Sequence, residues 1–308
     1  MKILLIGASG QLGADILRNN PGHEIFAPGR DRLDLQNVQQ LEDGVCNVRP
    51  DVVINCAAFH NVPLCEEQPD KAFLINCFAV GRLAGFCRQY GARFVTFSSD
   101  YVFGGGKVTP YAENDAPQPV QIYGITRAAG EYAAIAAARE HAVIVRTCGL
   151  YGRSGAASKG GNFVDKRIAD AKTGKSLEMG TDQIVCPTST DDLSRAVLAL
   201  IEHRQCAPGI YHLVNEGECS WFEFTKAIYD LLGLKTDLRP VDREGLTGSM
   251  RRPLYSVLGN TKARALGVVL PVWKDALARY LRSKYDGNGK LLSVTPLRDT
   301  LEGRNQCL

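Results

Sequence analysis

Tyr123 and Arg127 are the residues of this sequence whose types and spacing best fit a chemical reaction. They lie four residues apart at the start of an alanine-rich stretch that is predicted to be helical to about His141, so they share one helix face. Ser98 and Ser99 lie at the end of a predicted strand earlier in the chain. A serine hydroxyl can hold a carbonyl oxygen while a phenol protonates it, and a nearby cation favours the phenolate that remains. Alone, the Tyr–Arg pair also fits a cation packed on a ring at a helix surface.

A proton donor of this kind reduces a carbonyl only beside a hydride donor, and the beginning of the sequence predicts a dinucleotide site. An apolar run of strand length opens the chain, and glycines follow at G-x-x-G-x-x-G spacing. Gly7 permits a tight turn, Gly10 lets the backbone approach a pyrophosphate, and Gly13 lets the next helix pack closely on the strand. The first N–H groups of that helix, near Gln11 and Leu12, suit a dianionic ligand.

A second strand is predicted over residues 23–28. The residues that follow it indicate which dinucleotide is preferred. A carboxylate at this strand end would accept from the ribose 2′-OH of NADH, whereas an arginine suits the 2′-phosphate of NADPH. Arg30 follows the strand and no acidic residue lies at its end, so the sequence predicts NADPH, with NADH as the alternative. Arg30 and Arg32 also fit simple solvated loop charges. Asp34 is predicted to cap a helix that starts near Gln36 and to lie near the adenine.

Strands and helices alternate through the first half of the chain. Strands are predicted over 51–56, 93–98 and 142–147, with a helix over about 69–91 and the Tyr123 helix between them. This alternation predicts right-handed crossovers and a parallel, doubly wound α/β sheet, in which ligands bind at the carboxyl ends of the strands. Ala57 and Ala58 follow the 51–56 strand and are small enough for a cofactor to pass close to the backbone.

The second half of the chain is less regular and predicts a smaller lobe. We expect a helix over 191–203, a strand over 210–214 that returns to the main sheet, and helices over 162–172 and 220–232. Ser220 and Glu223 form a capping-box pattern at the start of the last of these. The glycine- and serine-rich stretch 153–161 is expected to be a mobile loop.

The domains are therefore expected to be interleaved in sequence. A Rossmann domain would comprise residues 1–148 and about 190–214, and a substrate lobe would comprise about 149–189 and 215–283. The polar, aperiodic residues 284–308 are expected to form a loosely attached tail. Substrate would then bind in the cleft between the two domains.

The composition is that of an ordinary globular protein, with 45% hydrophobic and 22% charged residues. A net charge of +3 without a basic stripe gives no case for a nucleic acid or a membrane as partner, and no apolar run reaches the roughly 18 residues of a membrane span. The ten cysteines form no C-x-x-C pair and the five histidines form no ligand cluster. We therefore expect reduced core cysteines, no metal site and a cytoplasmic location.

Longer blocks of the sequence resemble a known family. The first-half blocks are similar to the extended short-chain dehydrogenase/reductases of the NAD(P)-dependent epimerase/dehydratase superfamily: GASGQLG at 7–13, NCAAF at 55–59, FSSDYVFGG at 97–105 and YGITRAAGE at 123–131. Three later blocks narrow the resemblance to the dTDP-4-dehydrorhamnose reductase family: DQIVCPTSTDDL at 182–193, GIYHLVNEGECSW at 209–221 and RRPLYSVL at 251–258. The resemblance covers residues 1 to about 283.

This resemblance implies a Rossmann-like fold and reduction of the C4 ketone of a nucleotide-linked deoxysugar by NADPH or NADH. It maps the catalytic Ser/Thr-Tyr-Lys set of the family onto Ser99, Tyr123 and Arg127, of which the last two would also contact the cofactor. It further implies a set of substrate contacts: Ser99, Asp100, Tyr101, Asn162 and Arg252. A homodimer is compatible with it.

The sequence departs from the family pattern at three places. Arg127 stands where the family has lysine, Cys148-Gly149 replaces Ser-Trp, and residues 61–64 read NVPL where the family has AVDK. Arginine keeps the positive charge but cannot release a proton, so phenolate stabilisation is expected to survive whereas a proton relay through this residue is not. Gly149 is expected to remove an aromatic wall from the sugar pocket.

Two hypotheses of function follow. The first is the NADPH-dependent reductase. The second is a non-catalytic dinucleotide-binding protein that regulates or scaffolds a partner, as the regulatory beta subunit of methionine adenosyltransferase does within the same family; Arg127 and the missing tryptophan favour it. An epimerase or dehydratase on the same scaffold is a weaker third reading, because Asp100 is followed by Tyr101 rather than by a second acid.

Overall fold

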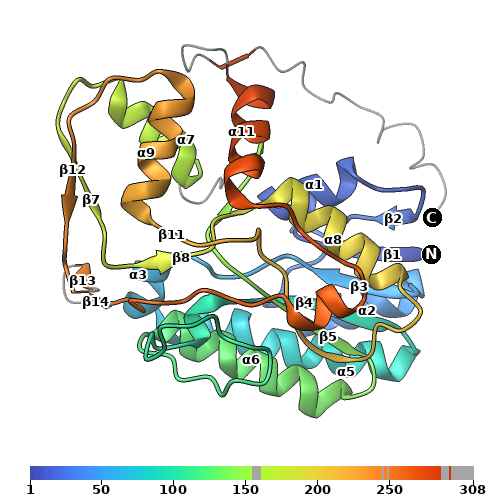
Figure 1. The fold of residues 1–308 in the computed structure, drawn as a ribbon. Coiled ribbons are helices and arrows are strands. Elements are labelled where there is room, and N and C mark those ends of the chain that lie inside the picture. The colour runs from blue at the N-terminus through green and yellow to red at the C-terminus, as the bar shows by residue number, and fades with distance from the viewer. Residues whose placement is uncertain (155–160, 245, 248–249, 286–290, 293–308) are drawn as a thin grey trace.

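Six parallel strands form the centre of the molecule (Figure 1), in the order β10-β5-β4-β3-β1-β2. The computed structural model describes residues 1–154, 161–244, 246–247, 250–285 and 291–292 of the 308-residue chain. The strands are β1 (Lys2–Ile6), β2 (Glu24–Phe26), β3 (Val52–Asn55), β4 (Arg93–Ser99), β5 (Ala142–Thr147) and β10 (Gly209–His212). Strand β2 lies on one side of β1, and the chain then crosses over to place β3 on the other side. The topological switch point of this doubly wound sheet therefore lies beside β1. The predicted fold class is confirmed.

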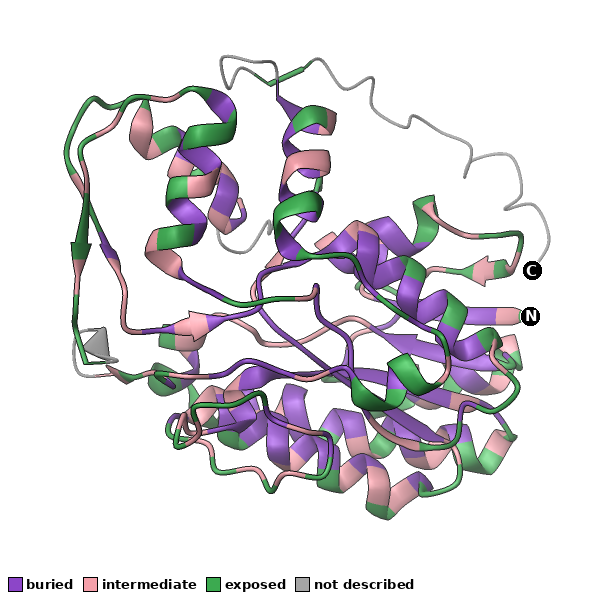
Figure 2. Ribbon diagram, in the orientation of Figure 1, coloured by how far each residue is buried: buried purple, intermediate pink, exposed green. Residues whose placement is uncertain are grey.

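Helices cover both faces of the sheet, which explains why its strands are continuous apolar runs. One face carries α1 (Gln11–Arg18) and α8 (Thr190–Glu202), and the other carries α2 (Val38–Val48), α5 (Ala79–Tyr90) and α6 (Ile122–Ala138). The central strands β1, β3, β4 and β5 are buried along most of their length (Figure 2), whereas the edge strand β2 is largely exposed. The predicted return of the 210–214 strand to the main sheet is also confirmed, because β10 pairs in parallel with β5.

The helix predicted from Pro69 to Gly91 is continuous but contains one wide turn. It consists of α4 (Pro69–Phe73), a π-helical turn η1 (Leu74–Phe78) and α5, and Gly91 ends it with a φ of 73°. At the wide turn, helix α6 comes so close that a Cβ on Gly130 would lie 2.1 Å from the carbonyl oxygen of Asn76. The π turn therefore places Asn76 directly against the helix that carries Tyr123.

One local expectation in the first half was wrong, and one short helix was not predicted. Helix α2 begins at Val38 and is capped by Asn37, whose side chain accepts from the Gln40 backbone N–H, so Asp34 does not cap it. Asp34 instead accepts from the N–H of Gln36 in a tight local turn, which delays the helix by two residues. A short helix that we did not predict, α3 (Val62–Glu67), begins after Asn61 at the segment that departs from the family pattern.

A second lobe stands beside one end of the sheet (Figure 1). Its helices are α7 (Phe163–Ala171), α9 (Trp221–Leu232) and α11 (Trp273–Lys284), which pack around an aromatic core that includes Tyr151, Phe224, Trp273 and Tyr280. The short strands are β6 (Leu150–Tyr151), β7 (Leu177–Gly180), β8 (Ile184–Val185), β9 (Thr188–Ser189), β11 (Cys219–Ser220), β12 (Leu238–Val241), β13 (Leu246–Thr247) and β14 (Met250–Arg251). Helix α10 (Thr261–Ala265) packs beside β10, and Ala263, Val268 and Leu270 belong to the core of the main sheet. Apart from this segment the separate cores support the interleaved division given above, which stays a prediction.

The beginning of the expected tail belongs to this lobe. Lys284 and Tyr285 are buried, and both bind the carboxylate of Asp165, with Lys284 Nζ at 2.8 and 2.9 Å from its two oxygens. The tail boundary at 284 was therefore wrong by two residues, because a charged residue that looks solvated in sequence has a buried partner. The rest of the expected tail, apart from 291–292, and residues 155–160 of the expected mobile loop lie outside the described residues.

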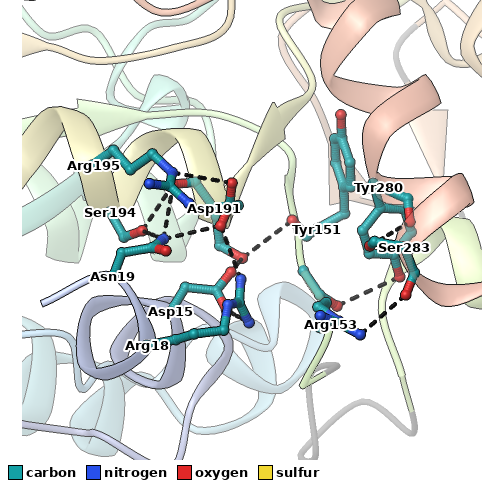
Figure 3. A network of polar contacts seen from close by, with 12 residues as sticks. Asp15, Arg18, Asn19, Tyr151, Arg153, Asp191, Ser194, Arg195, Tyr280 and Ser283 are labelled. Atoms are coloured by element: carbon teal, nitrogen blue, oxygen red, sulfur yellow. Dashed lines mark hydrogen bonds and ion pairs between the residues drawn. The ribbon is translucent and has the colours of Figure 1, made fainter. Parts of the chain in front are cut away.

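A polar network joins the first helix to the chain segments that enter the second lobe (Figure 3). Thr190 Oγ1 donates to Asp15 Oδ2 at 2.6 Å and lies 3.3 Å from the carbonyl oxygen of Tyr151. Arg18 bridges Asp15 and Asp191, at 2.6 and 3.0 Å. The helix that follows the glycine turn is thus fixed to both α8 and β6.

The capping box predicted at Ser220 is confirmed, because its side chain accepts from the Glu223 N–H and the Glu223 carboxylate accepts from the Ser220 N–H. Ser220→Ala removes the acceptor for a helix N-terminal N–H, so we expect the free energy of unfolding to fall by about 1 kcal/mol. Urea unfolding followed by circular dichroism measures this change. Ser176→Ala, at an exposed position, is the control and should change stability by less than about 0.5 kcal/mol. An equal loss in both variants would contradict the capping role.

Candidate active site

The glycine turn after β1 has the geometry that its spacing predicted. Gly7 has a φ of 81°, and a Cβ there would lie 2.8 Å from the backbone nitrogen of Ala57. A Cβ on Gly13 would lie 2.3 Å from the carbonyl oxygen of Gly7, so helix α1 packs directly on the turn. Gly10 differs from both: it is exposed, precedes the helix, and a Cβ there would meet only the Gly7 carbonyl oxygen, at 3.3 Å. Space for a ligand therefore lies over Gly10.

The residues around this turn fit a dinucleotide. Among the described residues, several buried side-chain atoms near the carboxyl ends of the strands lack a hydrogen-bond partner, including Gln11 Oε1, Asn55 Nδ2 and Thr147 Oγ1. Buried polar atoms are nearly always paired, so these atoms indicate a polar ligand that carries hydroxyl or phosphate groups. The N-terminus of α1, from Gln11 and Leu12 onward, faces the same turn and suits a pyrophosphate.

Arg30 and Asp34 form an ion pair at the expected adenosine end of the site, with Nε of Arg30 at 3.0 Å from Asp34 Oδ2. The carboxylate also accepts the Gln36 N–H. The Arg30 side chain is still 72% exposed, so its guanidinium is accessible to a phosphate. Ala57 and Ala58 lie partly exposed after β3, where Ala57 contacts the glycine turn.

Tyr123 lies in the first turn of α6, and the start of this helix is tightly fixed. A Cβ on Gly124 would lie 2.0 Å from the carbonyl oxygen of Tyr101, so only glycine fits between α6 and the 3-10 turn η2 (Asp100–Val102). The Tyr101 and Tyr123 rings meet edge to face with centroids 6.0 Å apart. This packing directs Tyr123 toward the carboxyl end of β4.

The three predicted catalytic residues lie near one another: Arg127 is one helical turn from Tyr123 on α6, and Ser99 accepts the N–H of Tyr101, whose ring packs on Tyr123. Burial raises the pKa of the Tyr123 phenol above its ordinary value, while the positive charge of Arg127 and the hydroxyl of Ser99 act in the opposite direction. Ser99 and Arg127 are both buried, with Arg127 only 6% exposed. The arrangement is thus a phenol with a hydroxyl and a cation beside it, which is what proton transfer to a carbonyl oxygen requires.

Asn76 belongs to the site and was missed from the sequence. Its Oδ1 accepts the Phe59 N–H and its Nδ2 donates to the Phe59 carbonyl, both at 2.9 Å. The same Nδ2 also donates to Thr126 Oγ1 at 3.1 Å. The Arg127 guanidinium lies 3.5 Å from Asn76 Oδ1. The one signal in the sequence was a polar residue inside an apolar helical stretch, which does not reveal its partners.

A small cavity of about 10 Å³ lies beside Arg127, lined also by Asn76, Ser98 and Glu131. Within the part of the chain that the structure describes, Arg127 Nε and Ser98 Oγ have no hydrogen-bond partner. The cavity volume is close to the minimum for one water molecule, which would satisfy both atoms. Ser98 therefore lines this cavity, whereas Ser99 binds the N–H of Tyr101, whose ring packs on Tyr123.

Two residues predicted to contact substrate have other partners. Asn162 is buried and caps α7: its Oδ1 accepts the Asp165 N–H, and its Nδ2 donates to the Gly152 carbonyl and to the Tyr280 hydroxyl. These bonds hold the Asn162 amide inside the second lobe, and the expected substrate contact of Asn162 stays a prediction. Asp100 is 3% exposed and its carboxylate accepts from three protein donors, so it does not face a ligand directly.

Tyr101 and Arg252 are partly exposed and remain available to a substrate. The charge of Arg252 lowers the pKa of Tyr101, although burial, the larger effect, raises it. Among the described residues, Arg252 Nε has no hydrogen-bond partner. The Tyr101 ring itself packs against Tyr123.

An aromatic ring lies next to Gly149, where we expected the pocket to lack one. Gly149 has a φ of 54°, and a Cβ there would lie 3.2 Å from Cη2 of Trp221 and 3.3 Å from Cα of Pro187. Trp221 is partly exposed and packs on Phe163 with ring centroids 4.5 Å apart. The indole thus comes from α9 in the second lobe, which the sequence spacing did not reveal.

The sequence and the fold were compared with known proteins. The family model described as RmlD substrate binding domain matches residues 1–285. The chain belongs to this family. The RmlD-family chain is 36% identical over 285 residues to the spore coat polysaccharide biosynthesis protein SpsK of Bacillus subtilis, covering 92% of this chain and 98% of that protein.

Named reductases are also similar to this RmlD-family chain. The dTDP-4-dehydrorhamnose reductase of Sinorhizobium fredii is 32% identical over 290 residues, covering 91% of this chain and 96% of that protein. A crystal structure of dTDP-4-dehydrorhamnose reductase from Bacillus anthracis in complex with NADP superposes with a TM-score of 0.86 at 33% identity, covering 92% of this chain and 99% of that one. The resemblance seen in the sequence motifs is confirmed.

Changing Arg127 tests the electrostatic role of the cation. Arg127→Gln removes the charge that lowers the pKa of Tyr123, so we expect that pKa to rise and the phenol to become a weaker acid. Turnover at pH 7 should fall by about ten- to a hundredfold, and the alkaline limb of the pH–rate profile should move to higher pH. Arg127→Lys keeps the charge and is the control. A shift of the limb to lower pH in Arg127→Gln would contradict this role.

Proposed function

We propose that this RmlD-family protein uses NADPH to reduce the C4 ketone of a dTDP-linked 6-deoxysugar, as an oxidoreductase in the synthesis of dTDP-rhamnose or a related sugar. The observation that supports this most strongly is the position of Ser99 at the end of β4, next to Tyr123 and Arg127 on α6, at the carboxyl ends of the strands where the glycine turn also lies. The relatives named dTDP-4-dehydrorhamnose reductase and the neighbour in complex with NADP support both the substrate class and the cofactor.

The residues that would hold NADPH are distributed along the edge of the sheet. Gly7, Gly10 and Gly13 with the α1 N-terminus would hold the pyrophosphate, and Arg30 would bind the 2′-phosphate. Tyr123 and Arg127 would contact the nicotinamide end. The cofactor supplies the hydride, and no protein group replaces it in that role.

The protein's own contribution is to bind the ketone and protonate it. Tyr123 donates its phenolic proton to the ketone oxygen, and Arg127 and Ser99 stabilise the phenolate that remains. Burial keeps Tyr123 protonated at neutral pH, so the proton is present before the reaction begins. Tyr101, Arg252 and Trp221 would line the substrate side, where Arg252 suits a phosphate of the nucleotide.

A direct assay tests this proposal. The protein is incubated with NADPH and dTDP-4-keto-6-deoxymannose, and absorbance of the reduced cofactor is followed at 340 nm. We expect turnover with this substrate and little with the free sugar. Absence of turnover in both the wild type and Arg127→Lys would contradict the reductase proposal. The alternative would then be a regulatory dinucleotide-binding protein, which requires that a pull-down captures a partner.

Location and assembly are further parts of the proposal. Within the described ranges, no helix is long and apolar enough to cross a membrane. None of the nine cysteines among the described residues forms a disulfide, which favours the reducing cytoplasm as the site of action. We also propose a homodimer, and light scattering at micromolar concentration would test it.

A further inference from the structure

The carboxylate of Asp100 joins the catalytic serine to the second half of the chain. Its Oδ1 accepts the Ser99 hydroxyl at 2.9 Å, and its Oδ2 accepts the Ser256 hydroxyl at 2.6 Å and the Cys148 thiol at 3.1 Å. Ser256 is fully buried and lies 156 residues away in sequence, in the RRPLYSVL block that also carries Arg252. Three hydrogen-bond donors from separate segments therefore converge on one buried acid.

No cation shares this site. Among the described residues, none of the ion pairs includes Asp100. A buried carboxylate without a cation depends on its hydrogen-bond donors, because burial penalises the charged form. The three donors are thus what keeps Asp100 in place.

The single hydrogen of the Ser99 hydroxyl decides what this serine can do. While it points to Asp100, the Ser99 oxygen is only an acceptor, and it already accepts the Tyr101 N–H at 3.2 Å. To donate to a ketone oxygen or to the Tyr123 phenolate, the hydrogen must rotate away from Asp100. Asp100 then keeps only two donors, of which the thiol is the weak one.

We propose that Asp100 and Ser256 are positioning residues for Ser99: Asp100 orients the Ser99 hydroxyl, and Ser256 stabilises the carboxylate when Ser99 turns its hydrogen to the reacting oxygen. The short Ser256–Asp100 hydrogen bond is charge-assisted, which makes it the stronger of the two that remain. Ser256 and Arg252 lie in the same segment, 251–258. A substrate that contacts Arg252 would therefore also influence the Ser99 hydroxyl through Ser256 and Asp100. This inference rests on the proposed function.

The first test is a double-mutant cycle at pH 8, which favours the ionised carboxyl. Ser256→Ala should lower kcat about tenfold, with little change in KM for NADPH, because Asp100 then holds the Ser99 hydrogen more strongly. In a Ser99→Ala background the same change should have no further effect on kcat. Ser256→Cys, which keeps the shape and a weak donor, should fall between wild type and Ser256→Ala. Equal losses in both backgrounds, or a loss in KM alone, would overturn the proposal.

A second measurement does not depend on turnover. The ¹³Cζ chemical shift of Tyr123, in protein labelled at its tyrosines and assigned with Tyr123→Phe, responds to hydrogen bonding at the phenol oxygen. We expect Ser256→Ala to move this resonance in the wild-type background and to leave it unchanged in Ser99→Ala. If the Tyr123 resonance moves in this Ser99-dependent way in a protein that shows no turnover, the inference stands and the proposed function is wrong. If the protein turns over but the resonance does not move in this way, the proposed function stands and the inference is wrong.

Discussion

Replacing Tyr123 with phenylalanine is expected to lower kcat by about a thousandfold while NADPH affinity stays nearly unchanged. The change removes only the phenolic oxygen, which is the proton donor, and keeps the ring that packs edge to face on Tyr101. Steady-state kinetics with the dTDP-sugar gives kcat, and fluorescence titration gives the NADPH Kd. Because burial raises the pKa of this phenol, the wild type should keep its acid protonated throughout the neutral range.

The matched control for this change lies on the same helix. Tyr132 is 60% exposed on α6, so Tyr132→Phe removes a hydroxyl from the same element without touching the site. It should retain full turnover. If Tyr123→Phe lost NADPH binding and turnover together, the phenol would be a cofactor-binding group rather than the acid.

Gly10→Val is expected to weaken NADPH binding by at least a hundredfold without unfolding the protein. A valine side chain would occupy the open space over the glycine turn, where the pyrophosphate is expected to lie. The backbone at Gly10 is extended, with φ of −78° and ψ of 171°, which valine adopts readily. Calorimetric titration with NADPH measures the affinity, and the thermal midpoint reports the fold.

Two other glycines give this experiment its contrast. Gly106→Val adds the same side chain at an exposed position with no atom within 4 Å, and it should leave both affinity and stability unchanged. Gly13→Val would place its Cβ 2.3 Å from the Gly7 carbonyl oxygen, so it should unfold or misfold the domain instead. Normal NADPH binding by a folded Gly10→Val protein would exclude this turn as the pyrophosphate site.

Arg127 stands where the family pattern has a lysine, and its position in the structure shows which part of the lysine role an arginine can keep. Arg127 keeps a buried positive charge beside Tyr123 and contacts Asn76, so the electrostatic part of the lysine role is preserved. A guanidinium does not release its proton, so protons that reach Tyr123 after each turnover come by another route. The comparison of Arg127→Gln with Arg127→Lys separates these two roles.

Local patterns were sufficient to predict the first half of the fold. Continuous apolar runs of strand length, glycines at fixed offsets and capping residues act within a few residues of one another, so the sequence carries them directly. Local patterns did not predict the N-cap of α2 correctly, because two nearby polar residues could each have capped this helix. Asn37 rather than Asp34 caps α2, because Asp34 is already bound by Arg30 and the Gln36 N–H.

The sequence by itself determined the parallel sheet and the glycine turn, because each depends on residue type and spacing within one element or at one strand end. It also offered Ser98, Ser99, Tyr123 and Arg127 as candidates, and the family resemblance selected Ser99 with Tyr123 and Arg127. Only the tertiary structure decided what surrounds them. Ser256 reaches Asp100 across 156 residues, and Trp221 reaches Gly149 from another lobe. Asn162, which was predicted to contact substrate, caps α7 and donates to the Tyr280 hydroxyl. Such partners are set by how distant segments pack, and a buried polar group takes whichever partner that packing supplies.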